Sequence, residues 1–170
     1  GSGFDLGAKH INPDIEILKT YHPGAIEVAF GDPEWGATTS RQAMDNGADV
    51  IFAAGGATGN GGLIEIASEA DAGSRVFCIG VDLDQWYSVP EAQPCLITSA
   101  EKHMVQGVSD LIVQAAAGEM PTGNVYGTVG LAPYHDFDSQ ISDEIKATIE
   151  EIAAALNDGS MVTGHEFGME

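Results

Sequence analysis

The glycine-rich stretch at residues 52–62, FAAGGATGNGG, has the composition of a ligand-binding loop. It follows a β-branched run and precedes an apolar helical pattern, as a phosphate-binding loop does. A Walker-type loop requires Gly-Lys-Ser/Thr, but Gly59 is followed by Asn60. The dinucleotide pattern G-x-G-x-x-G fits only with Thr58 in the place of a glycine. The stretch is therefore either backbone that a ligand approaches closely or a tight strand-to-helix turn without a ligand.

Asp82 and Lys102 are the charged residues best suited to recognising a polar, uncharged ligand. A carboxylate accepts hydrogen bonds from two neighbouring hydroxyls, and a lysine donates to ring or hydroxyl acceptors. The chain has only four lysines, which favours a binding function for Lys102 over a solvated surface position. Asp82 and Asp84 could form a carboxylate pair, although acids at strand ends more often cap turns.

Motifs for catalysis or for binding metals are missing from the sequence. It contains no Gly-x-Ser-x-Gly nucleophile elbow, and its five histidines lack metal-ligand spacing. Cys78 and Cys95 lie in apolar runs rather than in a Cys-x-x-Cys pair. They are either neighbouring buried thiols or a disulfide. We therefore predict that the protein is not an enzyme and has no catalytic residue, metal or cofactor.

The charge balance is strongly acidic. The 170 residues include 26 Asp and Glu against 6 Lys and Arg, a formal net charge of −20. Such a field repels nucleic acid, so we predict no nucleic-acid partner. Because 44% of the residues are hydrophobic, we expect one folded domain, and the acidity then indicates a halophilic source, where salt screens self-repulsion.

Apolar patterning predicts an α/β fold with a mainly parallel layered sheet and helices on both faces. We expect strands at 15–18, 49–54, 75–82 and 95–99, and an extended segment at 126–131. We expect helices at 35–46, from 63 onward, at 104–117 and at 145–156, the last capped by Ser142 or Ser139. In such sheets ligands bind at the carboxyl ends of the strands. The glycine-rich stretch, Asp82 and residues 99–102 all fall there.

A series of motifs follows in order along the chain: NPDI at 12–15, FGDPEWG at 30–36, GADVIF at 47–52 leading into AAGGATGNGG, IGVDLDQ at 79–85, LITS with Lys102 at 96–102, and VGLAP at 129–133. In order and spacing this series resembles the basic membrane protein family, the substrate-binding lipoproteins of ABC importers, which are similar in fold to type I periplasmic binding proteins. The resemblance extends from Gly3 to about Gly164.

The resemblance implies that the protein binds a nucleoside, above all a purine nucleoside, between two lobes. Phe30 would stack on the base, although an ordinary core aromatic is the alternative, and the backbone of Gly55 and Gly56 would approach the ligand. Asp82 would accept hydrogen bonds from the ribose hydroxyls, and Lys102 would donate to the ligand. The implied location is extracytoplasmic, at the cell surface, with an ABC permease as partner and an N-terminal lipid anchor that is absent from this chain.

The resemblance also implies a domain organisation, because the family's chains are nearly twice as long. Residues 1–99 would form the ligand-binding second lobe, 100–123 a hinge and a helix of the first lobe, and 124–170 a return strand and the C-terminal helix. The apolar face of helix 104–117 would then pack against a second copy, a retained fragment or the remaining lobe. The alternative functions are a small-molecule-sensing regulatory protein of the same fold and a nucleotide-using α/β enzyme.

Overall fold

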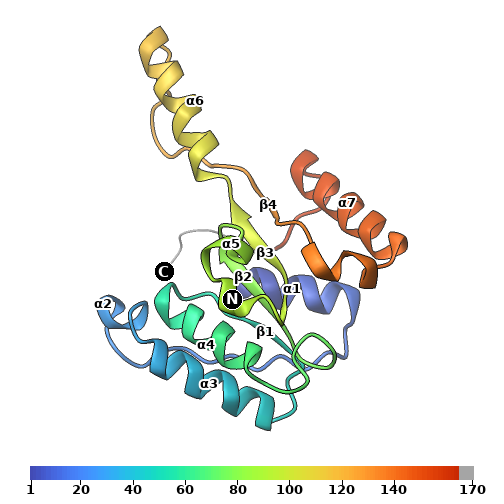
Figure 1. Cartoon of the computed structure of the whole chain (residues 1–170). Coiled ribbons are helices and arrows are strands. Elements are labelled where there is room, and N and C mark those ends of the chain that lie inside the picture. Colours follow the sequence, from blue (N-terminus) through green and yellow to red (C-terminus); the bar gives the residue numbers. More distant parts are fainter. Residues whose placement is uncertain (165–170) are drawn as a thin grey trace. The chain divides into compact units, whose positions relative to one another are not determined.

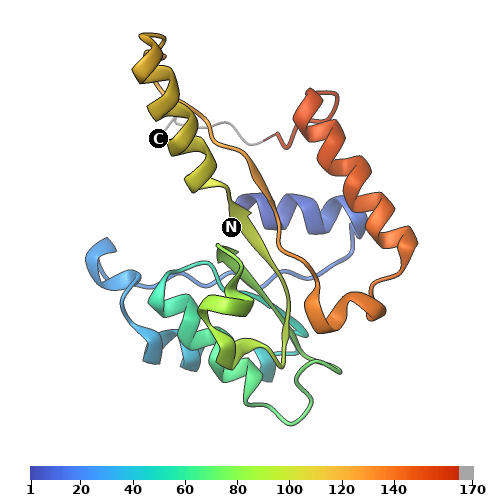
Figure 2. The same cartoon turned by 45° about the horizontal axis from the view of Figure 1, so that its top comes forward.

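The structure is a computed structural model that describes residues 1–164. The chain divides into two compact units. The larger is residues 22–136, and the other combines residues 1–21 with the described part of 137–170. Their elements can be followed by colour in Figures 1 and 2.

A four-stranded sheet forms the centre of the larger unit. Its strands, in the order β1-β2-β3-β4, are β1 (Val50–Phe52), β2 (Phe77–Asp82), β3 (Leu96–Lys102) and β4 (Val129–Leu131). The first three run parallel, and β4 runs antiparallel to β3. The mainly parallel α/β class is therefore confirmed.

Helices connect and flank these strands. They are α2 (Ile26–Ala29), α3 (Pro33–Asp45), α4 (Ala57–Ala67), α5 (Gln85–Ser88), the 3-10 helix η1 (Pro90–Ala92) and α6 (Met104–Ala117). α4 packs on β2 and against α3, and Figures 1 and 2 show α3 and α4 side by side. The expected helix at 104–117 is confirmed, and it ends at Gly118, whose φ of 79° is left-handed.

Most glycines of the stretch 52–62 serve packing of the protein itself. A Cβ at Gly61 would overlap the backbone of Pro33 at the start of α3, and a Cβ at Gly59 would overlap the carbonyl oxygen of Ala53. In the opposite direction, a Cβ at Gly36 of α3 would overlap the carbonyl oxygen of Thr58. These glycines let α4 lie unusually close to α3 and to the end of β1.

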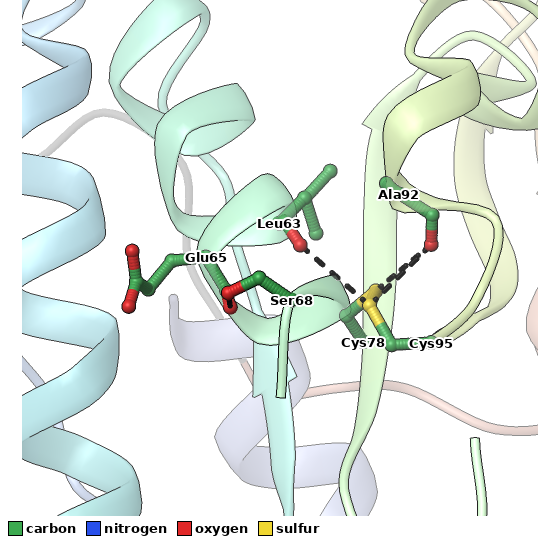
Figure 3. The surroundings of a disulfide bond; sticks show 6 residues. All are labelled: Leu63, Glu65, Ser68, Cys78, Ala92 and Cys95. Carbon is green, nitrogen blue, oxygen red and sulfur yellow. Dashed lines mark hydrogen bonds between the residues drawn. A yellow bond between two sulfur atoms is a disulfide. The ribbon is translucent and has the colours of Figure 1, made fainter. Parts of the chain in front are cut away.

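The core of the larger unit lies between the sheet and the layer formed by α4, α5 and η1. Its buried members are Leu63, Ile66, Val76, Cys78, Val89, Ala92, Cys95 and Leu96. Cys78 and Cys95 form a disulfide, which decides between the two alternatives left open by the sequence. Both residues are fully buried. In Figure 3 the carbonyl oxygens of Leu63 and Ala92 face the disulfide, at 3.6 and 3.4 Å from Cys95 Sγ.

The other unit contains α1 (Ser2–Ile11) and α7 (Asp143–Asp158), with the 3-10 helix η2 (His135–Gln140) leading into it. Of the two predicted caps for α7, the structure selects Ser142, whose hydroxyl accepts a hydrogen bond from the N–H of Ile145 at 3.3 Å. Gly159 ends this helix in the left-handed conformation. The predicted helix and its cap are thus confirmed.

The strand predicted at residues 15–18 is wrong. These residues are described and adopt no regular structure. Their alternation of apolar and polar side chains fits a strand, but a strand also requires a neighbouring backbone to pair with. The one backbone hydrogen bond found here, from Ile15 N to Asn12 O, is local.

In the described part of the chain, the helices are too short or too polar to cross a membrane.

Candidate functional site

The carboxyl ends of β1, β2 and β3 bring the predicted site residues to one edge of the sheet. Gly55 and Gly56 follow β1, Asp82 ends β2 and Lys102 ends β3. These strands are parallel neighbours, and neighbouring strands lie about 4.8 Å apart. Asp82 is paired with Glu101, the residue before Lys102, whereas β1 ends at Phe52, which is paired with Ile79. The placement at the carboxyl edge is as the sequence predicted.

Asp82 and Lys102 form an ion pair across neighbouring strand ends. Lys102 Nζ lies 2.6 Å from Asp82 Oδ1. The Asp82 side chain is 43% exposed and that of Lys102 is 58% exposed, while Asp82 Oδ1 itself is shielded from solvent. One carboxylate oxygen is therefore committed to the lysine, and the exposed remainder of the group is available as a hydrogen-bond acceptor. The pair as a whole carries no net charge.

The backbone at Asp82 is held in an uncommon conformation by Gln85. Asp82 has a φ of 74°, which is rare outside glycine. Gln85 Oε1 accepts a hydrogen bond from the N–H of Val81 at 2.8 Å, and Gln85 Nε2 donates to Asn60 Oδ1 at 2.8 Å. The backbone N–H of Gln85 donates to Ser99 Oγ at 3.1 Å. The buried Gln85 thus joins β2, β3 and α4 immediately beside Asp82.

Phe30 lies beside the glycine loop and is not a core aromatic. It follows α2, and its side chain is 55% exposed. A Cβ on Gly56 would lie 3.1 Å from the carbonyl oxygen of Phe30 and 3.5 Å from its ring atom Cδ1. Gly56 also has a φ of 57°, so both its backbone and its neighbour require glycine. The ring is thus exposed beside the glycine loop.

Asp32 and His22 fix the segment that follows Phe30. Asp32 Oδ1 accepts a hydrogen bond from Trp35 N at 3.0 Å and so caps α3. Its Oδ2 lies 3.2 Å from His22 Nε2. The Trp35 N–H and then the His22 ring lower the pKa of Asp32 below its ordinary value. His22 Nδ1 accepts a hydrogen bond from Gly24 N at 3.0 Å, which places the ring proton on Nε2, facing the carboxylate.

Asp84 bonds to other groups than Asp82 does. It caps α5 by accepting a hydrogen bond from Trp86 N at 3.1 Å, as strand-end acids commonly do. Its Oδ2 lies 2.9 Å from His135 Nε2. The His135 ring stacks on Trp86 with centroids 4.6 Å apart and meets the ring of Tyr87 edge-on. This cluster anchors the chain after β4 to α5.

The structure therefore brings the predicted residues together as two pairs, Asp82 with Lys102 and Phe30 with Gly56. Gly55 lies in the same loop, where a Cβ would be in ordinary contact at 3.4 Å from the Gly59 nitrogen. Sequence reasoning did not identify the residues that support these pairs, which are Gln85, Asn60, Thr58, Asp32 and His22. Within residues 1–164, no group of three or more His, Cys, Asp or Glu is arranged to hold a metal ion.

Comparison with known proteins identifies relatives across most of the chain. It is 33% identical over 180 aligned residues to the CD4+ T-cell-stimulating antigen of Listeria monocytogenes, an alignment that covers 94% of this chain and 46% of that protein. It is 40% identical over 100 residues to basic membrane protein A1 of Borrelia garinii, covering 59% of this chain and 26% of that one. The chain thus spans about half the length, or less, of these curated relatives.

Solved structures share the fold. An ABC transporter solute-binding protein from Aeropyrum pernix K1 superposes with a TM-score of 0.76 at 22% identity, covering 98% of this chain and 54% of that one. A transcriptional activator of the comK gene from Bacillus halodurans superposes with a TM-score of 0.66 at 18% identity, covering 80% of this chain and 46% of that one. A family model described as ABC transporter substrate-binding protein PnrA-like matches residues 1–133. The chain belongs to this family, Bmp, whose description names substrate binding.

Proposed function

We propose that this chain forms most of one lobe of an extracytoplasmic ABC-importer binding protein, whose ligand is a nucleoside and in the first place a purine nucleoside. The observation that carries the proposal is the Asp82–Lys102 ion pair, at 2.6 Å, at the carboxyl edge of the sheet, where Gly56, with Phe30 beside it, follows β1. Family membership supports substrate binding. The nucleoside is what the resemblance to the family implies, and the chemistry of these residues, which suits a neutral polar ligand, fits it.

Each of the four groups fits one part of a nucleoside. The exposed ring of Phe30 stacks on the base, and the bare backbone at Gly56 leaves room beside it. The carboxylate of Asp82 accepts hydrogen bonds from the ribose hydroxyls, while Lys102 donates to an acceptor on the ligand. An acid and a base that neutralise each other suit an uncharged ligand, whereas a phosphate would meet the Asp82 carboxylate without a lysine in the glycine loop to hold it.

The lobe assignment is part of the same proposal. Residues 1–99 form the ligand-binding lobe, 100–123 a hinge and a helix of the other lobe, and 124–170 the return strand and C-terminal helix. β3 leads directly into α6 and β4 returns from it, with the N–H of His103 donating to the carbonyl oxygen of Thr128 at 3.0 Å. Two adjacent strands that carry the chain out and back are suited to a hinge.

The apolar face of α6 supports this assignment. All fourteen residues of α6 are described, and none of them is buried. Val105, Val108 and Ile112 repeat at helical spacing, and Val105 is 78% exposed. An apolar stripe of this kind normally packs against a partner. We propose that the other lobe covers it, with a homo-oligomer through α6 as the competing outcome of a light-scattering measurement.

The buried disulfide supports an extracytoplasmic location, since disulfides persist in oxidising compartments. We propose a lipid anchor preceding this chain and delivery of the ligand to an ABC permease. The net charge of −20 supports a halophilic source, and equal stability in dilute buffer and in molar salt would contradict that part of the proposal.

The test is calorimetric titration of the protein as its gene encodes it with adenosine and with 2′,3′-dideoxyadenosine, in the unaltered protein and in Asp82→Ala. If Asp82 binds the ribose hydroxyls, the unaltered protein should bind dideoxyadenosine about tenfold more weakly than adenosine. The difference corresponds to the loss of at least one hydrogen bond to a charged group. The Asp82→Ala variant should bind both ligands with similar affinity. Equal discrimination by protein and variant would remove Asp82 from the site.

A further inference from the structure

We infer that Thr58 is a positioning residue that holds Phe30 in place for stacking on the base, an inference that rests on the proposed nucleoside site. Thr58 Oγ1 donates a hydrogen bond to the carbonyl oxygen of Ala29 at 2.8 Å and accepts one from the N–H of Asp32 at 2.8 Å. The N–H of Thr58 donates to the carbonyl oxygen of Phe30 at 3.4 Å. One buried side chain, 5% exposed, therefore ties the backbone on both sides of Phe30.

Phe30 needs such support because its own side chain is not held by packing. More than half of its side chain is exposed, so core packing does not hold the ring. The preceding helix α2 has only four residues, too few for a helix that is stable on its own. An unsupported aromatic residue would lose conformational freedom when it stacks on a ligand, which weakens binding. Restraining its backbone before the ligand arrives removes part of that cost.

α4 is a suitable anchor because its body is in the core. Leu63 and Ile66 of this helix are fully buried, and Thr58 lies in its first turn. Two residues further on, Asn60 accepts the hydrogen bond from Gln85, which in turn holds the backbone before Asp82. The start of α4 therefore sets the positions of the stacking ring and of the carboxylate relative to each other.

The test is a double-mutant cycle in the protein as its gene encodes it, with adenosine and guanosine titrated separately. Thr58→Val keeps the shape of the side chain and removes both hydroxyl hydrogen bonds, and we expect it to weaken binding about 3- to 10-fold. Thr58→Ser keeps the hydroxyl and should restore affinity to within about twofold. In a Phe30→Ala background, Thr58→Val should have no further effect.

A matched control is Thr148→Val, which removes a hydroxyl bond to the carbonyl oxygen of Glu144 in α7 and should leave affinity unchanged. Circular dichroism selects the variants that fold, and Thr58→Ala replaces Thr58→Val if the latter does not. The inference is overturned if Phe30→Ala weakens binding but Thr58→Val does not, or if Thr58→Val costs as much without Phe30 as with it. If neither nucleoside binds, or Phe30→Ala has no effect, the proposed site itself fails.

Discussion

Removal of the Cys78–Cys95 disulfide should destabilise the protein by about 3 kcal/mol. The bond closes a loop between residues 17 apart in sequence, and the chain-entropy relation for a loop of this length gives about 3 kcal/mol at 25 °C. The replacement is Cys78→Ala with Cys95→Ala, because both side chains are fully buried and alanine adds no polar group to the core. For a chain of this size such a loss lowers Tm by about 6 to 12 °C.

The assay is urea unfolding followed by circular dichroism, with thermal melting beside it. The control is the unaltered protein, which is unfolded, reduced and then refolded with reductant present. It lacks the disulfide but keeps both sulfur atoms. Two results would refute the reasoning. One is a change in unfolding free energy below about 1 kcal/mol, since even the smaller effects of native disulfides exceed this. The other is alkylation of both cysteines in protein purified and unfolded without reductant.

Three further predictions concern single residues. Phe30→Ala should weaken nucleoside binding about 10- to 100-fold, the range for loss of one aromatic–base stack, with little change in Tm because the ring is exposed; an unaltered Kd would contradict it. Gly61→Ala should destabilise the protein by about 1–3 kcal/mol through overlap with Pro33. By contrast, Gly7→Ala in α1, where a Cβ meets open space, should stabilise the protein by about 0.5–1 kcal/mol. Equal effects of Gly61→Ala and Gly7→Ala on the free energy of urea unfolding would count against the close packing of α3 and α4. Asp32, whose pKa is lowered in the folded state from its ordinary 3.8, stabilises the fold above pH 3.8, and this contribution is lost as pH falls through the lowered value. Asp32→Asn should therefore flatten the acid limb of the pH–stability curve, and an unchanged limb would refute that origin.

The elements with local signals were predictable from the sequence. Residues 104–117 carry a helical apolar pattern that stops at Gly118, and the structure gives α6 the same bounds. The apolar run at 75–82 likewise contains β2. Residues 15–18 show why patterning is not sufficient, because a strand depends on a partner supplied by distant parts of the chain. The disulfide could be suspected but not assigned, since the separation of Cys78 and Cys95 in space depends on the pairing of β2 with β3.

The candidate site was predictable to the extent that it follows from topology. Asp82 and Lys102 end neighbouring parallel strands, and parallel strands end at the same edge. The support of the site was not predictable, because Thr58 and Gln85 bond to backbone groups that only the tertiary fold leaves unpaired. The glycines of residues 52–62 were only partly understood: Gly56 is required beside Phe30, whereas Gly59 and Gly61 make room for other parts of the protein.

The central claim, that the sheet edge binds an uncharged nucleoside, is tested most directly by titrating the protein as its gene encodes it with guanosine and with guanosine 5′-monophosphate. We expect guanosine to bind and the monophosphate to bind at least about tenfold more weakly, since Lys102 is already paired with Asp82 and the glycine-rich stretch contains no lysine to hold a phosphate. Absence of guanosine binding, with tight binding of the monophosphate in the presence of magnesium, would contradict the account.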